Sequence, residues 1–458
     1  MTARLRTAVV LGGGLLLVIG SAAPAAAHGI GGRVDLPVPV WLFVWGAGAV
    51  VIVSFVALGV LWKEARLEDP AGSRPLPGPF QTLFRSRLVE AAVRTVSLGV
   101  FLGVVVAAAA GEDSAAANVA PVLVYVWFWV GMAFLHAVFG NLWATLSPWD
   151  TMARALGIGE RSRREYPLAW GRWPAVFPLF GFVWLELVYP AGASPRTLAV
   201  AIAGYTVVTL GGMSLFGRET WNRRGEAFAL YFDLLSRISP LARDRNGRVI
   251  LRPILGGLPE LFPMPGLVAF VMVLIGSTSF DGLSSSNLWL SWVGGLSPGA
   301  EVIVATTGLL GAIGAVTLAY SISMAAAGAI LRTPWHPLAV RFAHSLVPIA
   351  LAYATAHYFS LLVLEGQLGI RLVSDPLGLG WNLVGTANFI PNLALVSATT
   401  IWYVQVAAIV AGHVAGVVTA HDRSVALFPG QLAVRSQYAL LAVMVMFTVG
   451  GLILLSGA

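Results

Sequence analysis

The 458-residue sequence contains no cysteine and few charged residues, since Asp, Glu, Lys and Arg make up only 11% of the chain. The absence of cysteine excludes disulfide bonds, thiolate metal ligands and a cysteine nucleophile. A soluble domain carries about a quarter charged residues, whereas this chain is 57% hydrophobic, with a mean hydropathy of +0.81. The composition therefore predicts a multi-pass membrane protein and excludes an ordinary soluble domain.

Lipid offers no hydrogen-bond partners to backbone groups, so a spanning chain forms helices or a closed barrel. The long apolar runs lack the alternation typical of strands and indicate helices. We predict an all-α polytopic fold in one domain, residues 28–458, with ten transmembrane helices. Their ranges are Val40–Trp62, Leu88–Ala110, Val119–Thr145, Pro174–Val188, Thr197–Phe216, Pro265–Phe280, Val302–Leu331, Phe342–Leu364, Thr399–Ala420 and Tyr438–Leu455.

The N-terminus has the order of a secretory signal peptide. Arg4 and Arg6 precede an apolar run, and small residues follow up to Ala27. We expect residues 1–27 to be removed, because the apolar run is shorter than the ~20 residues that a transmembrane helix needs. The alternative is an uncleaved membrane anchor. Cleavage would make His28 the first residue of the mature chain and place it outside the cell.

Positive charge is concentrated in alternate connecting segments. They hold 22 of the 28 Lys and Arg residues, whereas the other connections hold three. By the positive-inside rule this bias predicts a plasma-membrane protein whose mature N-terminus lies outside. The net charge of +7 therefore reports topology, and we expect a lipid bilayer rather than nucleic acid as the partner. The basic segments are 63–87, 146–173, 218–262, 332–341 and 421–436.

Two connections are unusually long. The inner basic loop, 218–262, carries Trp221, Phe228 and Tyr231 at helical spacing among charged residues, which predicts an in-plane helix at the cytoplasmic face. The outer loop, 365–398, is glycine-rich and weakly periodic. Such loops are often lids or binding segments, and an ordinary cap over the helix ends is an equal alternative.

Three histidines fall within predicted transmembrane helices. At a rise of ~1.5 Å per residue, His136, His357 and His413 lie at similar depths, in a layer about 6 Å thick. Ionisable groups in hydrocarbon are costly and usually functional. Three neutral imidazoles suit a divalent transition metal such as zinc or copper. Alternatively, each histidine hydrogen-bonds a neighbouring helix and stabilises the bundle.

Further candidates surround this predicted centre. Tyr353, one turn from His357, and Glu186, in an apolar segment, are the candidate catalytic groups that would handle a proton. His28 offers a terminal amine and an imidazole, which together form a two-nitrogen chelate for a metal such as copper. The alternative is that cleavage leaves a histidine there without a role.

Several stretches carry a resemblance to a known family. They are AHGIGGRVDLPVPVWLF, HAVFGNLWATLSPWD, FGRETWNRRGEAFALYF, TPWHPLAVRFAHSLVPIALAYATAHYFSLLVLEGQ, SDPLGLGWNLVGT and IWYVQVAAIVAGHVAGVVTAHDR. Over nearly its whole length the chain resembles bacterial multi-pass proteins labelled fenitrothion hydrolase, a type common in actinobacteria. The resemblance implies membrane-bound hydrolysis of a hydrophobic aryl phosphotriester, with a second protein component. It supplies no catalytic residues.

Three functions therefore stay open. The first is a membrane hydrolase in which a metal-activated hydroxide attacks phosphorus. The second is a small-molecule or metal transporter, which ten helices and intramembrane histidines would also suit. The third is a non-catalytic subunit of a membrane enzyme complex.

Overall fold

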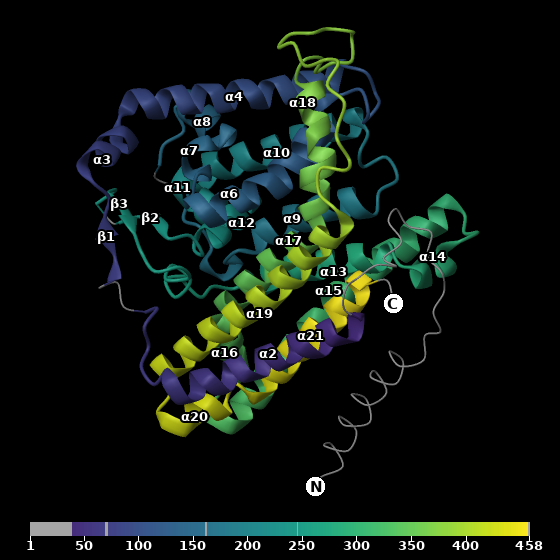
Figure 1. Cartoon of the computed structure of the whole chain (residues 1–458). Coiled ribbons are helices and arrows are strands. Elements are labelled where there is room, and N and C mark those ends of the chain that lie inside the picture. The colour runs from purple at the N-terminus through teal and green to yellow at the C-terminus, as the bar shows by residue number, and fades with distance from the viewer. Residues whose placement is uncertain (1–38, 69–71, 161–162, 245, 457–458) are drawn as a thin grey trace.

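The computed structural model describes residues 39–456 except 69–71, 161–162 and 245 (Figure 1). In this part of the chain, nine helices or continuous helical runs are long and apolar enough to cross a membrane. The structure thus confirms the predicted all-α polytopic membrane fold. The nine are α2 (Val40–Leu61), α4 (Arg87–Ala110), the run α5–η2–α6 (Val119–Phe139), α10 (Pro195–Phe216), α13 (Leu267–Ser284), α15 (Pro298–Leu331), the run α16–α18 (Trp335–Leu372), α19 (Ala398–Leu427) and the run α20–α21 (Gly430–Ile453).

Shorter elements connect or extend these helices. The helical ones are α3 (Gly78–Arg85), α7 (Trp143–Leu146), α8 (Pro148–Ala155), η3 (Leu168–Trp170), α9 (Trp173–Leu187), α11 (Arg218–Arg224), α12 (Ala227–Ser236) and α14 (Asn287–Val293). Within the compound runs, the segments are α5 (Val119–Pro121), η2 (Val122–Gly131), α6 (Met132–Phe139), α16 (Trp335–Phe342), η4 (Ala343–Leu346), α17 (Val347–Leu364), η5 (Glu365–Gln367), α18 (Leu368–Leu372), α20 (Gly430–Arg435) and α21 (Tyr438–Ser456). A small antiparallel sheet has the order β1 (Arg74–Pro75), β3 (Val249–Leu251), β2 (Leu241–Arg243).

The one remaining predicted span, Pro174–Val188, corresponds to α9, which has only 15 residues. At 1.5 Å per residue it is about 22 Å long, shorter than a hydrocarbon core of about 30 Å. Its N-cap, Arg172, donates its backbone N–H to Pro265 O, immediately before α13. Beyond its C-terminus, Ser194 bonds Asp113, which follows the far end of α4. The short helix therefore still connects the two ends of the bundle.

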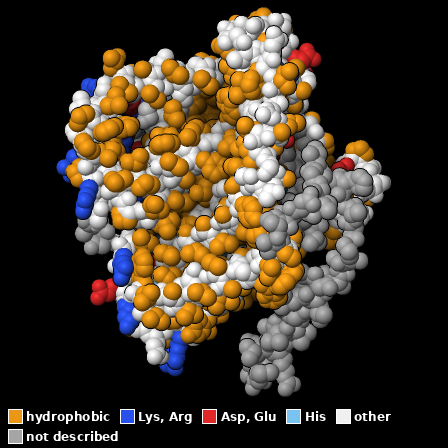
Figure 2. Space-filling model, in the orientation of Figure 1, with side chains coloured by type: hydrophobic (Ala, Val, Ile, Leu, Met, Phe, Trp, Pro, Cys, Tyr) orange, Lys and Arg blue, Asp and Glu red, His pale blue; other side chains and the backbone are white. Residues whose placement is uncertain are grey.

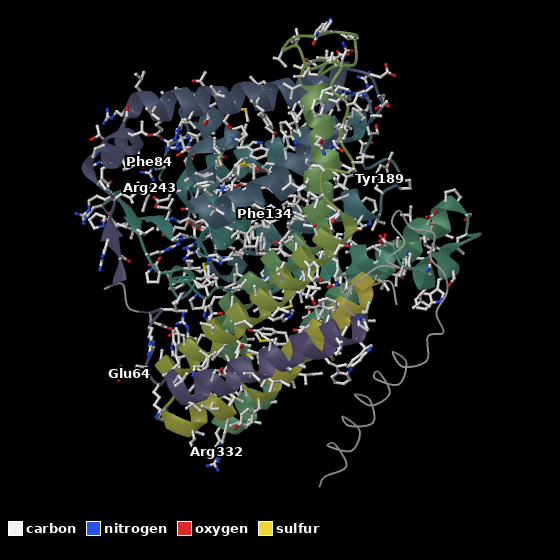
Figure 3. All side chains as sticks on the ribbon, in the orientation of Figure 1. Glu64, Phe84, Phe134, Tyr189, Arg243 and Arg332 are labelled. Carbon is white, nitrogen blue, oxygen red and sulfur yellow. The ribbon has the colours of Figure 1, made fainter. Side chains whose placement is uncertain are left out.

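The two ends of the bundle differ in charge. The "basic end" holds the start of α4, α8 and the start of α11, which are joined by ion pairs among Arg94, Asp150 and Arg218. Lys and Arg side chains gather along the left edge in Figure 2, and hydrophobic side chains cover most of the rest of that face. Arg243 lies toward that side in Figure 3, and Tyr189, just after α9, lies on the opposite side.

The helices form two groups with α13 and α17 between them. Helices α2, α15, α19 and α21 pack together in the lower part of Figure 1, and α4, α6, α9, α10 and α12 lie above them. A Gly-x-x-x-Gly pair brings α19 close to α17, because a Cβ on Gly412 would lie 2.1 Å from the Cβ of Ala352 and one on Gly416 would lie 3.0 Å from Ser345 O. Small residues that permit such close approach are typical of membrane helix interfaces.

The long basic loop differs from the prediction of an in-plane surface helix. Its helical part breaks at Gly225 into α11 and α12, and eight of the ten α12 residues are buried. Helix α12 packs among α6, α7, α9 and α17. The reason is that Leu230 and Leu234 supply a second buried apolar face, roughly opposite the one that the helical spacing revealed. This segment enters the bundle and becomes part of the core.

Candidate functional site

His136 has no nitrogen free for a metal. The residue, on α6, is fully buried. Its Nδ1 donates to Met132 O at 2.6 Å, and its Nε2 accepts the backbone N–H of Trp143 at 2.8 Å. The ring stacks on Phe232 with the centroids 4.3 Å apart. His136 therefore links α6 to the start of α7 by hydrogen bonds, which is the stabilising role considered above as the alternative to metal binding.

His357 and Glu186 lie in a polar cluster around Asp281, away from His136. The His357 Nε2 lies 2.9 Å from Asp281 Oδ2, and the Tyr358 hydroxyl donates to the same oxygen at 2.9 Å. Glu186, on α9, has one buried carboxylate oxygen without a hydrogen-bond partner in the described chain, and it lies near enough to Asp281 for the two charges to interact. Three helices, α9, α13 and α17, thus contribute ionisable groups to one place.

His413 lies apart from both of these histidines. It is fully buried on α19, its Nδ1 donates to Ile409 O at 2.9 Å, and its Nε2 is buried without a hydrogen-bond partner in the described residues. The neighbouring aromatic ring is that of Tyr353, 5.9 Å away between centroids. Tyr353 itself donates its hydroxyl to Phe447 O at 3.1 Å. The two residues face a small cavity that neither His136 nor His357 lines.

The described structure therefore does not bring His136, His357 and His413 together at one place. Among the described residues, no group of three or more His, Cys, Asp or Glu side chains could hold a metal ion. Equal depth along the helix axes does not fix the direction in which each ring points, and each ring found a different local partner. His28 and the predicted signal peptide, 1–27, lie outside the described residues.

A large apolar cavity lies between α4, η2, α9 and α10, and we call it the α4–α10 cavity. Its volume is about 840 Å³. Several of its lining side chains are also exposed on the outside of the bundle, including Val96 (67%), Val100 (56%) and Val208 (52%). These exposed lining side chains belong to α4 and α10, so the open side of the cavity lies along these two apolar helices. Its aromatic lining residues are Phe101, Trp127, Phe128, Trp143, Trp149, Phe182, Tyr205 and Phe228.

Tyr205 is the one ionisable side chain among the described residues that line this cavity. Its hydroxyl donates to the carboxylate of Glu226, which is 1% exposed and forms the N-cap of α12. The same carboxylate accepts from Phe228 N at 3.0 Å and from Trp143 Nε1 at 3.3 Å. An acid this deeply buried requires several donors. The Tyr205–Glu226 pair therefore anchors α12 against the cavity wall, and the Tyr205 and Ser97 hydroxyls lie in a lining that is otherwise mostly apolar.

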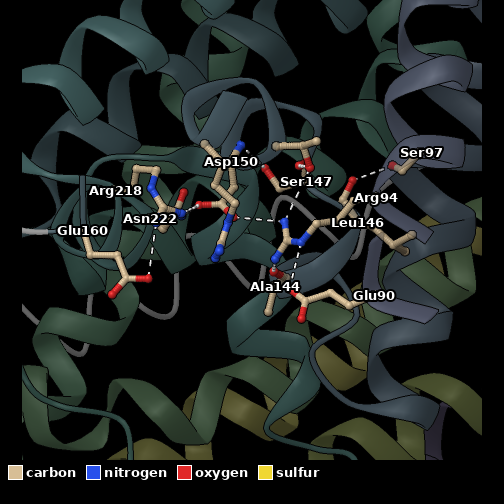
Figure 4. Close-up of polar contacts among 12 residues, drawn as sticks. Glu90, Arg94, Ser97, Ala144, Leu146, Ser147, Asp150, Glu160, Arg218 and Asn222 are labelled. Atoms are coloured by element: carbon tan, nitrogen blue, oxygen red, sulfur yellow. Dashed lines mark hydrogen bonds and ion pairs between the residues drawn. The ribbon is translucent and has the colours of Figure 1, made fainter. Parts of the chain in front are cut away.

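At the basic end, Asp150 collects three guanidinium groups (Figure 4). Its side chain is 6% exposed and lies 3.0 Å from Arg94, 2.8 Å from Arg154 and 2.9 Å from Arg218. Asn222 donates to it as well, at 3.2 Å. Burial alone would raise the pKa of Asp150, but the hydrogen bonds and charges of Arg154 and Arg218 hold it below its ordinary value. This cluster joins α4, α8 and α11 and is structural.

Sequence reasoning missed Tyr205 and Glu226. Tyr205, inside an ordinary apolar span, carried no signal. Glu226 carried no clear signal either, since the preferred N-cap residues are Ser, Thr, Asp and Asn rather than Glu. The chain matches no protein-family model, no curated protein and no solved structure. The interpretation of the site therefore depends on its own geometry.

Proposed function

We propose that this membrane protein takes up a hydrophobic, aromatic small molecule from the bilayer into the α4–α10 cavity. The observation that supports this proposal is a cavity of about 840 Å³ whose lining includes strongly exposed side chains of the apolar helices α4 and α10. Ligand sites are typically cavities of about 300–1,000 Å³, lined by apolar and aromatic side chains with few polar groups. The α4–α10 cavity has this character.

The lining favours an uncharged ligand with an aromatic ring. Trp149 and Tyr205 meet at 4.8 Å in an edge-to-face contact, and Phe128 and Phe182 each pack against Phe228. Aromatic rings accept another ring in edge or offset geometry. A charged ligand would find no counter-ion among the described lining residues, and its desolvation would be costly.

Hydrolysis of an aryl phosphotriester is the reaction we propose for such a ligand, on the basis of the resemblance to fenitrothion hydrolases. Water would add to phosphorus, the aryl ester bond would break, and a phenol and a dialkyl phosphate would leave. The hydroxyl groups in the described cavity wall are those of Ser97 and Tyr205, which donate to Leu146 O and to Glu226, so a phosphoryl oxygen would bind one of these hydroxyls by replacing its present acceptor. A divalent metal and a second protein component belong to the same proposal as predictions.

A filled-cavity variant tests the binding site. Gly204 lines the cavity, and a Cβ at this position would meet nothing within 4 Å, so Gly204→Leu would project into the cavity without a clash. Gly211, on the same helix, has equally open space but does not line the cavity, so Gly211→Leu is the matched control. We expect a 4-nitrophenyl dialkyl phosphotriester to bind the purified wild type and the control, and to bind Gly204→Leu about tenfold more weakly.

The same samples separate the functional alternatives. Release of 4-nitrophenol by the wild type, lost with a chelator and weakened in Gly204→Leu, supports a metal-dependent hydrolase. Release that requires a co-expressed second protein supports a partner subunit. Equal probe affinity for wild type, Gly204→Leu and Gly211→Leu would refute the cavity as the binding site.

Transport is the second candidate function, and the Asp281–His357 pair favours it. Ionisable groups within transmembrane helices often mark proton or substrate pathways. Helices α13 and α17 contribute these residues, and Glu186 of α9 adds an acid beside them. Proton-dependent uptake of the ester into sealed vesicles, without nitrophenol release and lost in Asp281→Asn, would support transport.

A further inference from the structure

A second, smaller cavity lies among α13, α15, α17, α19 and α21, away from the α4–α10 cavity. Its volume is about 30 Å³, enough for one or two water-sized occupants. Side chains from five different helices close it, and hydrocarbon groups form most of its wall. The described lining also carries one imidazole, two thioethers and two phenols.

The imidazole is that of His413, which lines the cavity and is fully buried. Because Nδ1 is engaged by Ile409 O, the atom available to a ligand is Nε2, which has no hydrogen-bond partner in the described chain. The two phenols of the lining cannot satisfy it, since Tyr353 donates to Phe447 O and Tyr320 donates to Ala339 O at 2.7 Å. An unpaired polar atom in such a place is costly.

The thioethers are those of Met272 and Met444, which are 0% and 3% exposed. Met272 is the sixth residue of α13 and Met444 the seventh of α21, so both come from the second turns of helices that pack against each other. Neutral imidazole nitrogen and thioether sulfur together form a soft ligand set. Oxygen ligands suited to a hard cation are absent from the described lining, apart from the two phenols.

We propose that His413, Met272 and Met444 form a buried site for a soft monovalent metal ion, Cu(I) or its analogue Ag(I). Soft thioether ligands select Cu(I) over zinc, which prefers thiolate, imidazole and carboxylate ligands. A monovalent ion also costs less to remove from water than a divalent one, which suits a cavity without an acidic group. The site does not depend on the proposed function of the α4–α10 cavity.

The test is metal binding by the full chain, purified in detergent. Anaerobic titration with Cu(I) against a chromophoric competitor, and with Ag(I) followed by elemental analysis, measures affinity and stoichiometry. We expect about one tightly bound ion per chain for Cu(I) and Ag(I), and none retained for Zn²⁺. Met272→Leu and Met444→Leu preserve side-chain volume and should fold. Each should weaken the binding about tenfold or more.

Met213→Leu is the matched control, because Met213 is also fully buried but lines neither cavity. Its affinity for Cu(I) should equal that of the wild type. Absence of binding by the wild type would overturn the proposal. Copper that persists unchanged in both Met272→Leu and Met444→Leu would also overturn it, and would direct attention to His28 as the ligand. X-ray absorption at the copper edge adds an independent readout, since the proposed site requires sulfur ligands.

Discussion

Replacement of Asp150 by asparagine should destabilise the basic end strongly. Asn preserves the shape of the side chain but removes its charge. Arg94 and Arg218, whose side chains are 11% and 8% exposed, would then lose their buried counter-ion. Removing one partner of a buried ion pair costs about 3–5 kcal/mol. We expect the low end, about 3 kcal/mol, because Glu90 still pairs with Arg94 and Glu160 with Arg218.

The assay is equilibrium unfolding of purified protein in mixed micelles, with wild type and variant measured under the same conditions. Glu219→Gln is the control, because Glu219 pairs with Arg223 on the surface, where both side chains are more than half exposed. Exposed pairs contribute about 0–1 kcal/mol. A loss in Asp150→Asn no greater than that in Glu219→Gln would refute the idea that this carboxylate holds the three elements together.

The pH dependence of stability gives the same residue a second test. The pKa of Asp150 is held below its ordinary value in the folded protein. Its contribution to stability is therefore complete above the unfolded pKa of about 4 and is lost as the pH falls through the folded pKa. The difference in unfolding free energy between wild type and Asp150→Asn should be constant from about pH 8 to pH 5 and shrink below about pH 4. A difference that stays constant down to pH 3 would contradict this assignment.

Three further predictions concern other parts of the bundle. His136→Ala should cost about 1–3 kcal/mol by leaving the buried N–H of Trp143 unpaired, with the metal content of the purified protein unchanged; a loss of bound metal would restore His136 as a ligand. Tyr205→Phe should cost about 1–3 kcal/mol by removing a hydrogen bond to Glu226, as measured by micellar unfolding, and an unchanged midpoint would contradict the role of the pair. Gly412→Leu should clash at the interface between α17 and α19 and cost about 1–3 kcal/mol or more, whereas Gly311→Leu, on open surface, should cost little; equal thermal stability of the two variants would refute it.

Local sequence patterns predicted the fold but few of the contacts that form the candidate site. Apolar runs predicted the nine helices that, in the described part of the chain, are long and apolar enough to cross a membrane, because transfer into lipid depends on the side chains of one segment alone. The short helix α9 is the exception, because it has only 15 residues, fewer than a transmembrane helix usually needs, and yet it connects the two ends of the bundle. Helical rise predicts the depth of each histidine but not the direction of its ring, and the His136 and His413 rings have separate hydrogen-bond partners.

By itself, the sequence determined that this chain is an all-α, multi-pass membrane protein with one strongly basic set of connections. Only the tertiary structure decided that α12 is buried, that Tyr205 meets Glu226 beside a large cavity, and that Asp281 engages His357. The physical reason is that hydropathy adds up along a chain, residue by residue. Which faces of two helices meet depends on packing between segments far apart in sequence, and that packing assigned each polar group its partner.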